Sequence, residues 1–232
     1  MMAANTNNYM GCYLIIAMNV AIFFLLHLVA QPVEFLQSLI ANTENLEAGR
    51  YWCILTSGLI HADLIHLFLN MLGVFVFGRV VEEHLGLGPT LFIYCGALII
   101  SMLFAIILNS FFFNKHLGIV GASGAVMGLL ASAMLLDPFK ITYEMVFPLP
   151  IMFKGWMYIY ADLKGLLNPQ PDGISHMAHV IGFFSVFCLV YFMPKQNRKK
   201  LNEGLMVNIF TLLLFLTAVF VVSILKSQQT NL

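Results

Sequence analysis

The feature of this sequence that most constrains its fold is a series of long apolar runs separated by short polar segments. Of the 232 residues, 60% are hydrophobic and only 9% are charged, whereas soluble domains carry about 25% charged residues. A helix that spans a bilayer needs roughly 20 mostly apolar residues, because unpaired backbone groups are not tolerated in hydrocarbon. The composition excludes a soluble enzyme, and we predict an all-α, polytopic membrane helix bundle.

Six of the runs have the length and apolarity of membrane spans, and a seventh is weaker. The weaker run contains Lys154, Asp162 and Lys164, and we count it as a span. The first run lacks the basic segment and small-residue cleavage site of a secretory signal peptide, so we expect it to remain in the protein. The predicted spans are 10–30, 55–77, 90–108, 119–136, 148–167, 174–193 and 205–225.

These spans divide the chain into a core and an appended helix. We expect residues 1–200 to form a six-helix core with an outer loop at 31–54, and residues 201–232 to form a seventh transmembrane helix with a short tail. The outer loop has an apolar pattern of its own, Val33, Phe35, Leu36 and Leu39. That pattern predicts a short helix lying on the membrane surface.

Charge sets the expected orientation. Lys and Arg number 11, as do Asp and Glu, so the net charge is zero and no basic surface is available for nucleic acid. The one basic cluster, Lys195, Arg198, Lys199 and Lys200, follows the sixth span. The positive-inside rule assigns this cluster to the cytoplasm, and six preceding spans then put the N-terminus there too. Arg79 and Lys140 then lie in inner loops, and Arg50, Lys115 and Lys164 lie outside. We expect a multi-pass protein of a plasma (inner) membrane.

Several polar side chains interrupt the apolar runs, where a charged group costs at least about 2.5 kcal/mol at a helix centre. Each also has a purely structural explanation, because small residues let helices pack closely and a lone His or Asn can hydrogen-bond to a neighbouring helix. They fall in three runs: His61, Asp63, His66 and Asn70 in the second, Gly121, Ser123 and Gly124 in the fourth, and Ser175, His176, His179 and Gly182 in the sixth.

The predicted topology argues that these residues act together. The second, fourth and sixth spans all run from outside to inside, so His66, Asn70, Ser123 and His179 lie in the outer halves of their helices. Separate packing roles would seldom place a hydroxyl, an imidazole and two further hydrogen-bonding groups at one depth. We infer a shared site that opens toward the outer face.

The residue types at this site suit acyl transfer. A Ser hydroxyl is a weak nucleophile until a base takes its proton, and neutral His suits that task. His66, Asn70 and the Ser123 backbone N–H are candidate donors to an oxyanion. No carboxylate has an obvious claim on His179, since Asp172 lies seven residues earlier in a predicted loop. We therefore predict a Ser-His dyad.

A metal centre is a weaker interpretation of the same residues. His176 and His179 lack the Glu and the spacing of a His-Glu-x-x-His motif, and His66 with Asn70 makes a poor zinc pair. The four cysteines are too far apart to form a disulfide framework or a metal pair. We expect neither a metal nor a cofactor.

The motifs, in their order and spacing, resemble those of the rhomboid family of intramembrane serine proteases. The resemblance covers residues 51–193 and rests on Trp52 with 55–57, His61, the His66-x-x-x-Asn70 pair, Gly78 with 81–82, the Gly121-Ala122-Ser123-Gly124 run and the Ala178-His179-x-x-Gly182 run. The chain departs from the family pattern at Cys53, Met127 and Val186. We expect the Met127 thioether to pack on a ring as the usual aromatic does, and Val186 to keep the fourth and sixth spans slightly apart unless the facing residues are small.

The resemblance implies roles for these residues. Ser123 would be the nucleophile and His179 the general base, with His66 and Asn70 stabilising the oxyanion and His61, Gly121, Gly124 and Gly182 supporting them. The substrates would be single-span membrane proteins, cleaved in the bilayer near the outer end of the transmembrane segment. Two other functions stay open: an inactive rhomboid-like protein that binds membrane proteins, and a small-molecule transporter, although no inverted repeat is visible.

Overall fold

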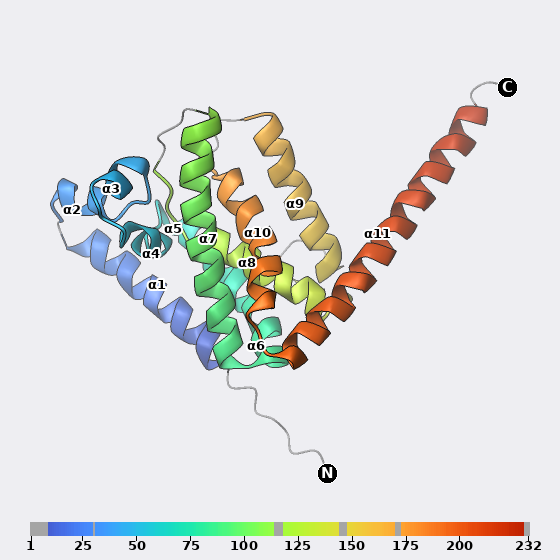
Figure 1. Ribbon diagram of the computed structural model, residues 1–232, viewed down its shortest axis with the longest axis horizontal. Coiled ribbons are helices and arrows are strands. Elements are labelled where there is room, and N and C mark those ends of the chain that lie inside the picture. Colours follow the sequence, from blue (N-terminus) through green and yellow to red (C-terminus); the bar gives the residue numbers. More distant parts are fainter. Residues whose placement is uncertain (1–8, 30, 114–117, 144–147, 170–172, 230–232) are drawn as a thin grey trace, which may run out of the picture.

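The protein is a bundle of helices arranged around the central helix α8 (Ser123–Leu136), as seen in the computed structural model (Figure 1). The structure describes residues 9–29, 31–113, 118–143, 148–169 and 173–229. All but three of the 14 residues of α8 are buried. The helix packs against α7 (Leu87–Phe113), α10 (His176–Tyr191) and α11 (Lys195–Gln229), so it forms the core of the bundle.

The remaining elements surround this core, and each of the seven predicted runs contains a helix. The only strands among the described residues form one two-residue antiparallel pair. The other elements are α1 (Met10–Leu28), α2 (Val33–Ser38), α3 (Thr43–Glu47), α4 (Cys53–Thr56), the 3-10 helix η1 (Ser57–Leu59), α5 (Leu64–Gly73), the π-helical η2 (Val74–Gly78), α6 (Arg79–Leu85), β1 (Ile141–Thr142), β2 (Leu149–Pro150) and α9 (Ile151–Leu167).

Within the described residues, four helices are long and apolar enough to cross a membrane: Met10–Leu28, Leu64–Leu85, Leu87–Phe111 and Lys195–Val222. Helices α8 and α10 are apolar but shorter, with 14 and 16 residues. Helix α9 has 17 residues and carries the three charged side chains noted in the sequence. The predicted all-α polytopic membrane fold is confirmed.

The predicted boundaries of the second span are wrong at both ends. The helix begins at Leu64, where Asp63 caps it by accepting a hydrogen bond from His66 N at 2.8 Å, and it continues through η2 to Leu85. The preceding apolar residues form α4 and η1 instead. Gly58 lies so close to Leu98 of α7 that a Cβ would meet its side chain at 2.6 Å, so this segment packs on α7 and leaves the axis of the span.

The outer loop contains two short helices, α2 and α3, rather than the single one expected. Asn45 ties them together, because its side-chain amide donates to Gln37 O and Ile40 O at 2.8 and 2.7 Å. A backbone bridge between Ala41 and Ile119 joins the loop to the segment that leads into α8. The loop is therefore fastened beside the N-terminus of the central helix.

The opposite end of the bundle gathers the start of α1, helix α6 and the start of α11 (Figure 1). The Glu82 carboxylate accepts Gly11 N and Cys12 N at 2.9 and 3.0 Å, and Lys140 pairs with Glu83 at 2.7 Å. Arg79, expected in a loop, lies in α6, and its guanidinium stands over the Tyr9 ring at 4.2 Å. Lys115, assigned to an outer loop, lies outside the described residues.

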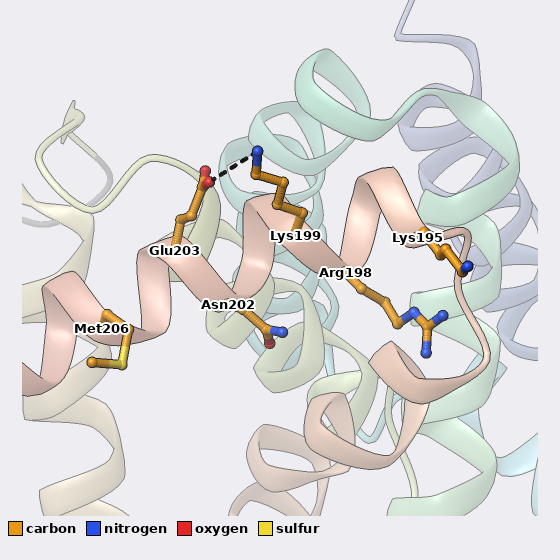
Figure 2. A pocket seen from close by; sticks show the side chains of 6 residues that line it. All are labelled: Lys195, Arg198, Lys199, Asn202, Glu203 and Met206. Atoms are coloured by element: carbon orange, nitrogen blue, oxygen red, sulfur yellow. Dashed lines mark ion pairs between the residues drawn. The ribbon is translucent and has the colours of Figure 1, made fainter.

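Helix α11 begins at Lys195, ten residues earlier than predicted, so the expected boundary at residue 200 falls inside it. In its first turns Lys195, Arg198 and Lys199 of the basic cluster line an open surface groove, where Lys199 pairs with Glu203 at 3.8 Å (Figure 2). Gly204 packs against the backbone of Leu135, and Asn208 donates to Met134 O at 2.8 Å. Beyond that point the helix diverges from the bundle (Figure 1).

Candidate functional site

Ser123 is the first residue of α8 and follows a tight turn. Gly121 has φ +102°, a conformation that residues with a Cβ rarely adopt. Its N–H donates to Ser57 O at 2.8 Å, which fixes the turn against η1. The turn thus places Ser123 at the helix N-terminus, where the first backbone N–H groups have no intrahelical acceptor.

His66 lies directly beside this turn. A Cβ on Gly121 would be 2.6 Å from His66 Cε1 and Nε2, so the glycine makes room for the imidazole. Asn70, one turn further along α5, is buried and donates to His66 O at 2.9 Å. An Asn amide carries two N–H donors, so this bond occupies one of them.

His61 supports His66 from the turn that precedes α5. The two rings meet edge to face, with centroids 5.1 Å apart. His61 is 2% exposed, and within the described part of the chain neither ring nitrogen has a hydrogen-bond partner. Burial, and secondarily the neighbouring His66, lower the pKa of His61 to about 4, so this ring is neutral near pH 7.

Helices α8 and α10 cross at Gly124 and Gly182. A Cβ on Gly182 would overlap the carbonyl oxygen of Gly124 and lie 2.8 Å from its carbonyl carbon. A Cβ on Gly124 would meet Ser101 of α7 and approach Ala178 O at 3.4 Å. The backbones touch here without side chains between them, so Ser123 and His179, which flank the crossing, are brought to the same place.

The hydroxyl and the imidazole do not form a hydrogen bond with each other among the described residues. Both are half-buried. Catalytic hydrogen bonds are often long in enzymes without bound substrate and shorten when the substrate arrives. The structure therefore brings together the neighbourhoods of Ser123, His66 and His179 and leaves the Ser-His contact open.

The prediction that His179 has no carboxylate partner is wrong. Its Nδ1 lies 2.9 Å from Asp162 Oδ1 of α9, and the Asp162 side chain is only 7% exposed. The two residues are 17 positions apart in the chain and meet because α9 packs against α10. Asp172, the carboxylate considered from the sequence, lies outside the described residues.

The same carboxylate oxygen also contacts His176, whose Nδ1 lies 2.8 Å away. One donor atom from each of Asp162, His176 and His179 lies within 4.8 Å of the others. The sequence pattern had marked Asp162 only as a charged residue that weakens the predicted span at 148–167. The signal that marks it is the cost of a charged group in an apolar helix, which makes such a residue a functional candidate.

The three departures from the family pattern are all buried. Cys53 is fully buried, so it faces the protein interior. Met127 and Val186 belong to the hydrophobic core. On α8, Gly128 lies so close to Ala97 that a Cβ would overlap it, and that Cβ would be 3.4 Å from Gly182 O. The backbones of α8 and α10 stay in contact at Gly182, so Val186 does not separate the two helices there.

Comparison with known proteins identifies rhomboid proteins as relatives of this chain. A Rhomboid domain model matches residues 48–196. The chain is 31% identical over 162 residues to RHOMBOID-like protein 6, mitochondrial, of Arabidopsis thaliana, covering 68% of this chain and 48% of that protein. It is 28% identical over 189 residues to Rhomboid protease AarA of Providencia stuartii, covering 72% and 66%.

A third relative, Rhomboid protease GluP of Bacillus subtilis (strain 168), is 34% identical over 125 residues, which cover 53% of this chain and 24% of that protein. The chain spans about half the length of the Arabidopsis relative. The matched segment 48–196 includes the turn before α5, the start of α8 and the start of α10. The chain is an integral membrane protein that belongs to the rhomboid family.

Proposed function

We propose that this chain is an intramembrane serine endopeptidase that cleaves single-span membrane proteins near the outer end of the transmembrane segment. The observation that carries the proposal is the crossing of α8 and α10 at Gly124 and Gly182, which holds the first residue of α8 beside the first turn of α10. Relatives named as rhomboid proteases support the same activity.

In this mechanism Ser123 Oγ attacks the scissile carbonyl and His179 accepts its proton. Asp162 acts as a positioning residue. An imidazole whose Nδ1–H donates to a carboxylate presents the lone pair of Nε2, and the 2.9 Å contact between His179 Nδ1 and Asp162 Oδ1 is suited to that arrangement. The proposed site is therefore a Ser-His pair oriented by a third group, in place of the dyad expected from the sequence.

The negative charge on the carbonyl oxygen would be stabilised from two sides. The N–H groups at the start of α8 have no intrahelical acceptor, and the N-terminus of a helix favours negative charge. On the other side lie the His66 ring beside Gly121 and the Asn70 amide. Preorganised donors of this kind supply much of the rate enhancement in acyl transfer.

The orientation belongs to the same proposal. The basic cluster at the start of α11 shares one end of the bundle with Lys140 and α6, since Lys200 Nζ donates to His84 O at 2.9 Å and Lys140 pairs with Glu83. With that end in the cytoplasm, the starts of α8 and α10 face outward. Cleavage then occurs toward the outer face of a plasma (inner) membrane.

The test is cleavage of a model single-span substrate in detergent, with labelling by a serine-directed phosphonate in parallel. Ser123→Ala and His179→Ala should each reduce cleavage to background, because a nucleophile and its base act as a unit. Wild-type protein should label and Ser123→Ala should not. Labelling that survives Ser123→Ala, or cleavage by that variant above a few per cent of the wild-type rate, would refute the assignment.

The same assay separates the other two functions. An inactive relative would bind a single-span protein without labelling or cleaving it. A transporter would carry a solute into vesicles at a rate that Ser123→Ala does not change. Neither function accounts for the Asp162 contact with His179.

A further inference from the structure

Helices α9 and α10 meet across a cluster of three potential metal ligands. Asp162 projects from α9, while His176 and His179 lie three residues apart on one face of α10. Both Nδ1 atoms approach the same oxygen, Asp162 Oδ1, at 2.8 and 2.9 Å. The carboxylate is 7% exposed and the two imidazoles 15% and 19%, so the cluster is desolvated but can be reached.

A glycine of α9 leaves the space in which the His176 ring lies. A Cβ on Gly165, one turn after Asp162, would overlap His176 Nε2 and lie 2.5 Å from its Cδ2 and Cε1. Only a residue without a side chain leaves space for the imidazole at this point. Two positions of α9 thus match the two imidazoles of α10: Asp162 provides a ligand, and Gly165 leaves space for the His176 ring.

The donor atoms are spaced for a small cation. They lie within 4.8 Å of one another, and tetrahedral zinc, with bonds of about 2.0–2.1 Å, holds its ligands roughly 3.3 Å apart. The two Nδ1···Oδ1 distances need to open by roughly half an ångström to admit the ion. Two imidazoles favour zinc over calcium or magnesium, which prefer oxygen ligands.

We propose that Asp162, His176 and His179 form a zinc site, and that zinc bound there switches the hydrolytic site off. The inhibitory half of this inference rests on the proposed function, because it requires His179 to be the base. The binding half does not. Three protein ligands leave one position of the tetrahedron open.

The inhibition follows from imidazole chemistry. Without metal, His179 donates Nδ1–H to Asp162 and offers the Nε2 lone pair to the serine hydroxyl. A neutral imidazole that coordinates through Nδ1 carries its single proton on Nε2, so it cannot accept another from Ser123. When zinc binds, the imidazole of His179 loses its proton from Nδ1 to solvent and takes one up from solvent at Nε2, so the ring stays neutral. The same carboxylate therefore orients the base without zinc and helps to block it with zinc.

Binding is tested in the Ser123→Ala protein, which needs no catalysis. Zinc is titrated against a chromogenic chelator, and one ion per chain is expected. His176→Gln and Asp162→Asn, each combined with Ser123→Ala, should lower the affinity at least about tenfold. Gly165→Ala, which fills the space that the His176 ring occupies, should lower the affinity likewise without removing a ligand. His27→Gln is the matched control, since His27 is exposed on α1 and bonds Phe23 O. Equal affinity in all five proteins would overturn the site.

Inhibition is tested on active protein, with each rate in zinc divided by the same variant's rate in chelator. Zinc should suppress wild-type and His27→Gln cleavage at least about tenfold at saturation, and chelator should restore it. His176→Gln and Gly165→Ala should need a higher zinc concentration for the same effect. If Ser123→Ala binds zinc but wild-type cleavage does not slow, the inhibitory half fails. If the metal-free protein cleaves nothing, the proposed function fails while the binding titration still decides the site.

Discussion

Replacing Gly182 with Ala tests the helix crossing that holds the proposed site together. The added Cβ would overlap Gly124 O and lie 2.8 and 2.9 Å from its carbonyl carbon and Cα, whereas ordinary contacts begin at 3.4 Å. Backbone atoms cannot rotate away, so α8 and α10 must separate. Overpacking of this kind costs about 1–3 kcal/mol in stability, and a displacement of about 1 Å between reacting groups costs about 100-fold in rate.

The assay measures single-turnover cleavage and phosphonate labelling per folded protein in detergent, together with the thermal unfolding midpoint. Gly182→Ala should unfold at a lower temperature and label about 100-fold more slowly, because the base has moved from the nucleophile. Gly88→Ala is the matched control, since nothing lies within 4 Å of a Cβ at that position of α7. A Gly182→Ala protein with wild-type stability and labelling would refute the argument that this contact sets the geometry.

Three further predictions concern the groups around the crossing. Asp162→Asn should lower kcat at least about tenfold with little change in KM, since an amide can present N–H to Nδ1 and reverse the tautomer; a change in KM alone would contradict the positioning role. Asn70→Ala and His66→Ala should each cleave about 10²–10³-fold more slowly than wild type yet still label, because the remaining donors hold the oxyanion; full rates in both would leave the oxyanion to the backbone. Because burial holds the pKa of His61 near 4 while the unfolded chain takes up a proton below about 6.5, the free energy of unfolding should fall by up to about 3 kcal/mol between pH 7 and pH 4. His61→Asn should reduce that slope, and an unchanged slope in urea titrations would contradict the assignment.

The sequence was sufficient to predict the helical runs because apolar length is a direct requirement of the bilayer. It misplaced the start of the second helix, since residues 55–60 are as apolar as a span. The break there depends on Gly58 packing against Leu98, a contact between residues 40 positions apart. Hydropathy carries no information about such contacts. The start of α11 was missed for the opposite reason, because its first ten residues are mostly polar.

Two features of the candidate site followed from local pattern, and one did not. The i, i+4 spacing of His66 and Asn70 and the glycines beside Ser123 can be read along the chain. The partner of His179 could not be found that way, because it comes from α9 and is defined only by helix packing. The free-energy cost of placing a charged group in an apolar helix would have singled out Asp162, whose carboxylate is buried.

The shortness of α8 bears on how deep in the bilayer the proposed active site lies. At 1.5 Å per residue its 14 residues extend about 21 Å, against a hydrocarbon layer about 30 Å thick. A helix whose inner end reaches the inner boundary therefore leaves its first residue roughly 9 Å below the outer one. Irregular backbone at that depth, such as the turn at Gly121, persists only inside protein or against a water-filled cavity. In the proposed enzyme a short central helix thus sets Ser123 below the membrane surface, where a full-length span would have carried it, so water must reach the serine through the protein.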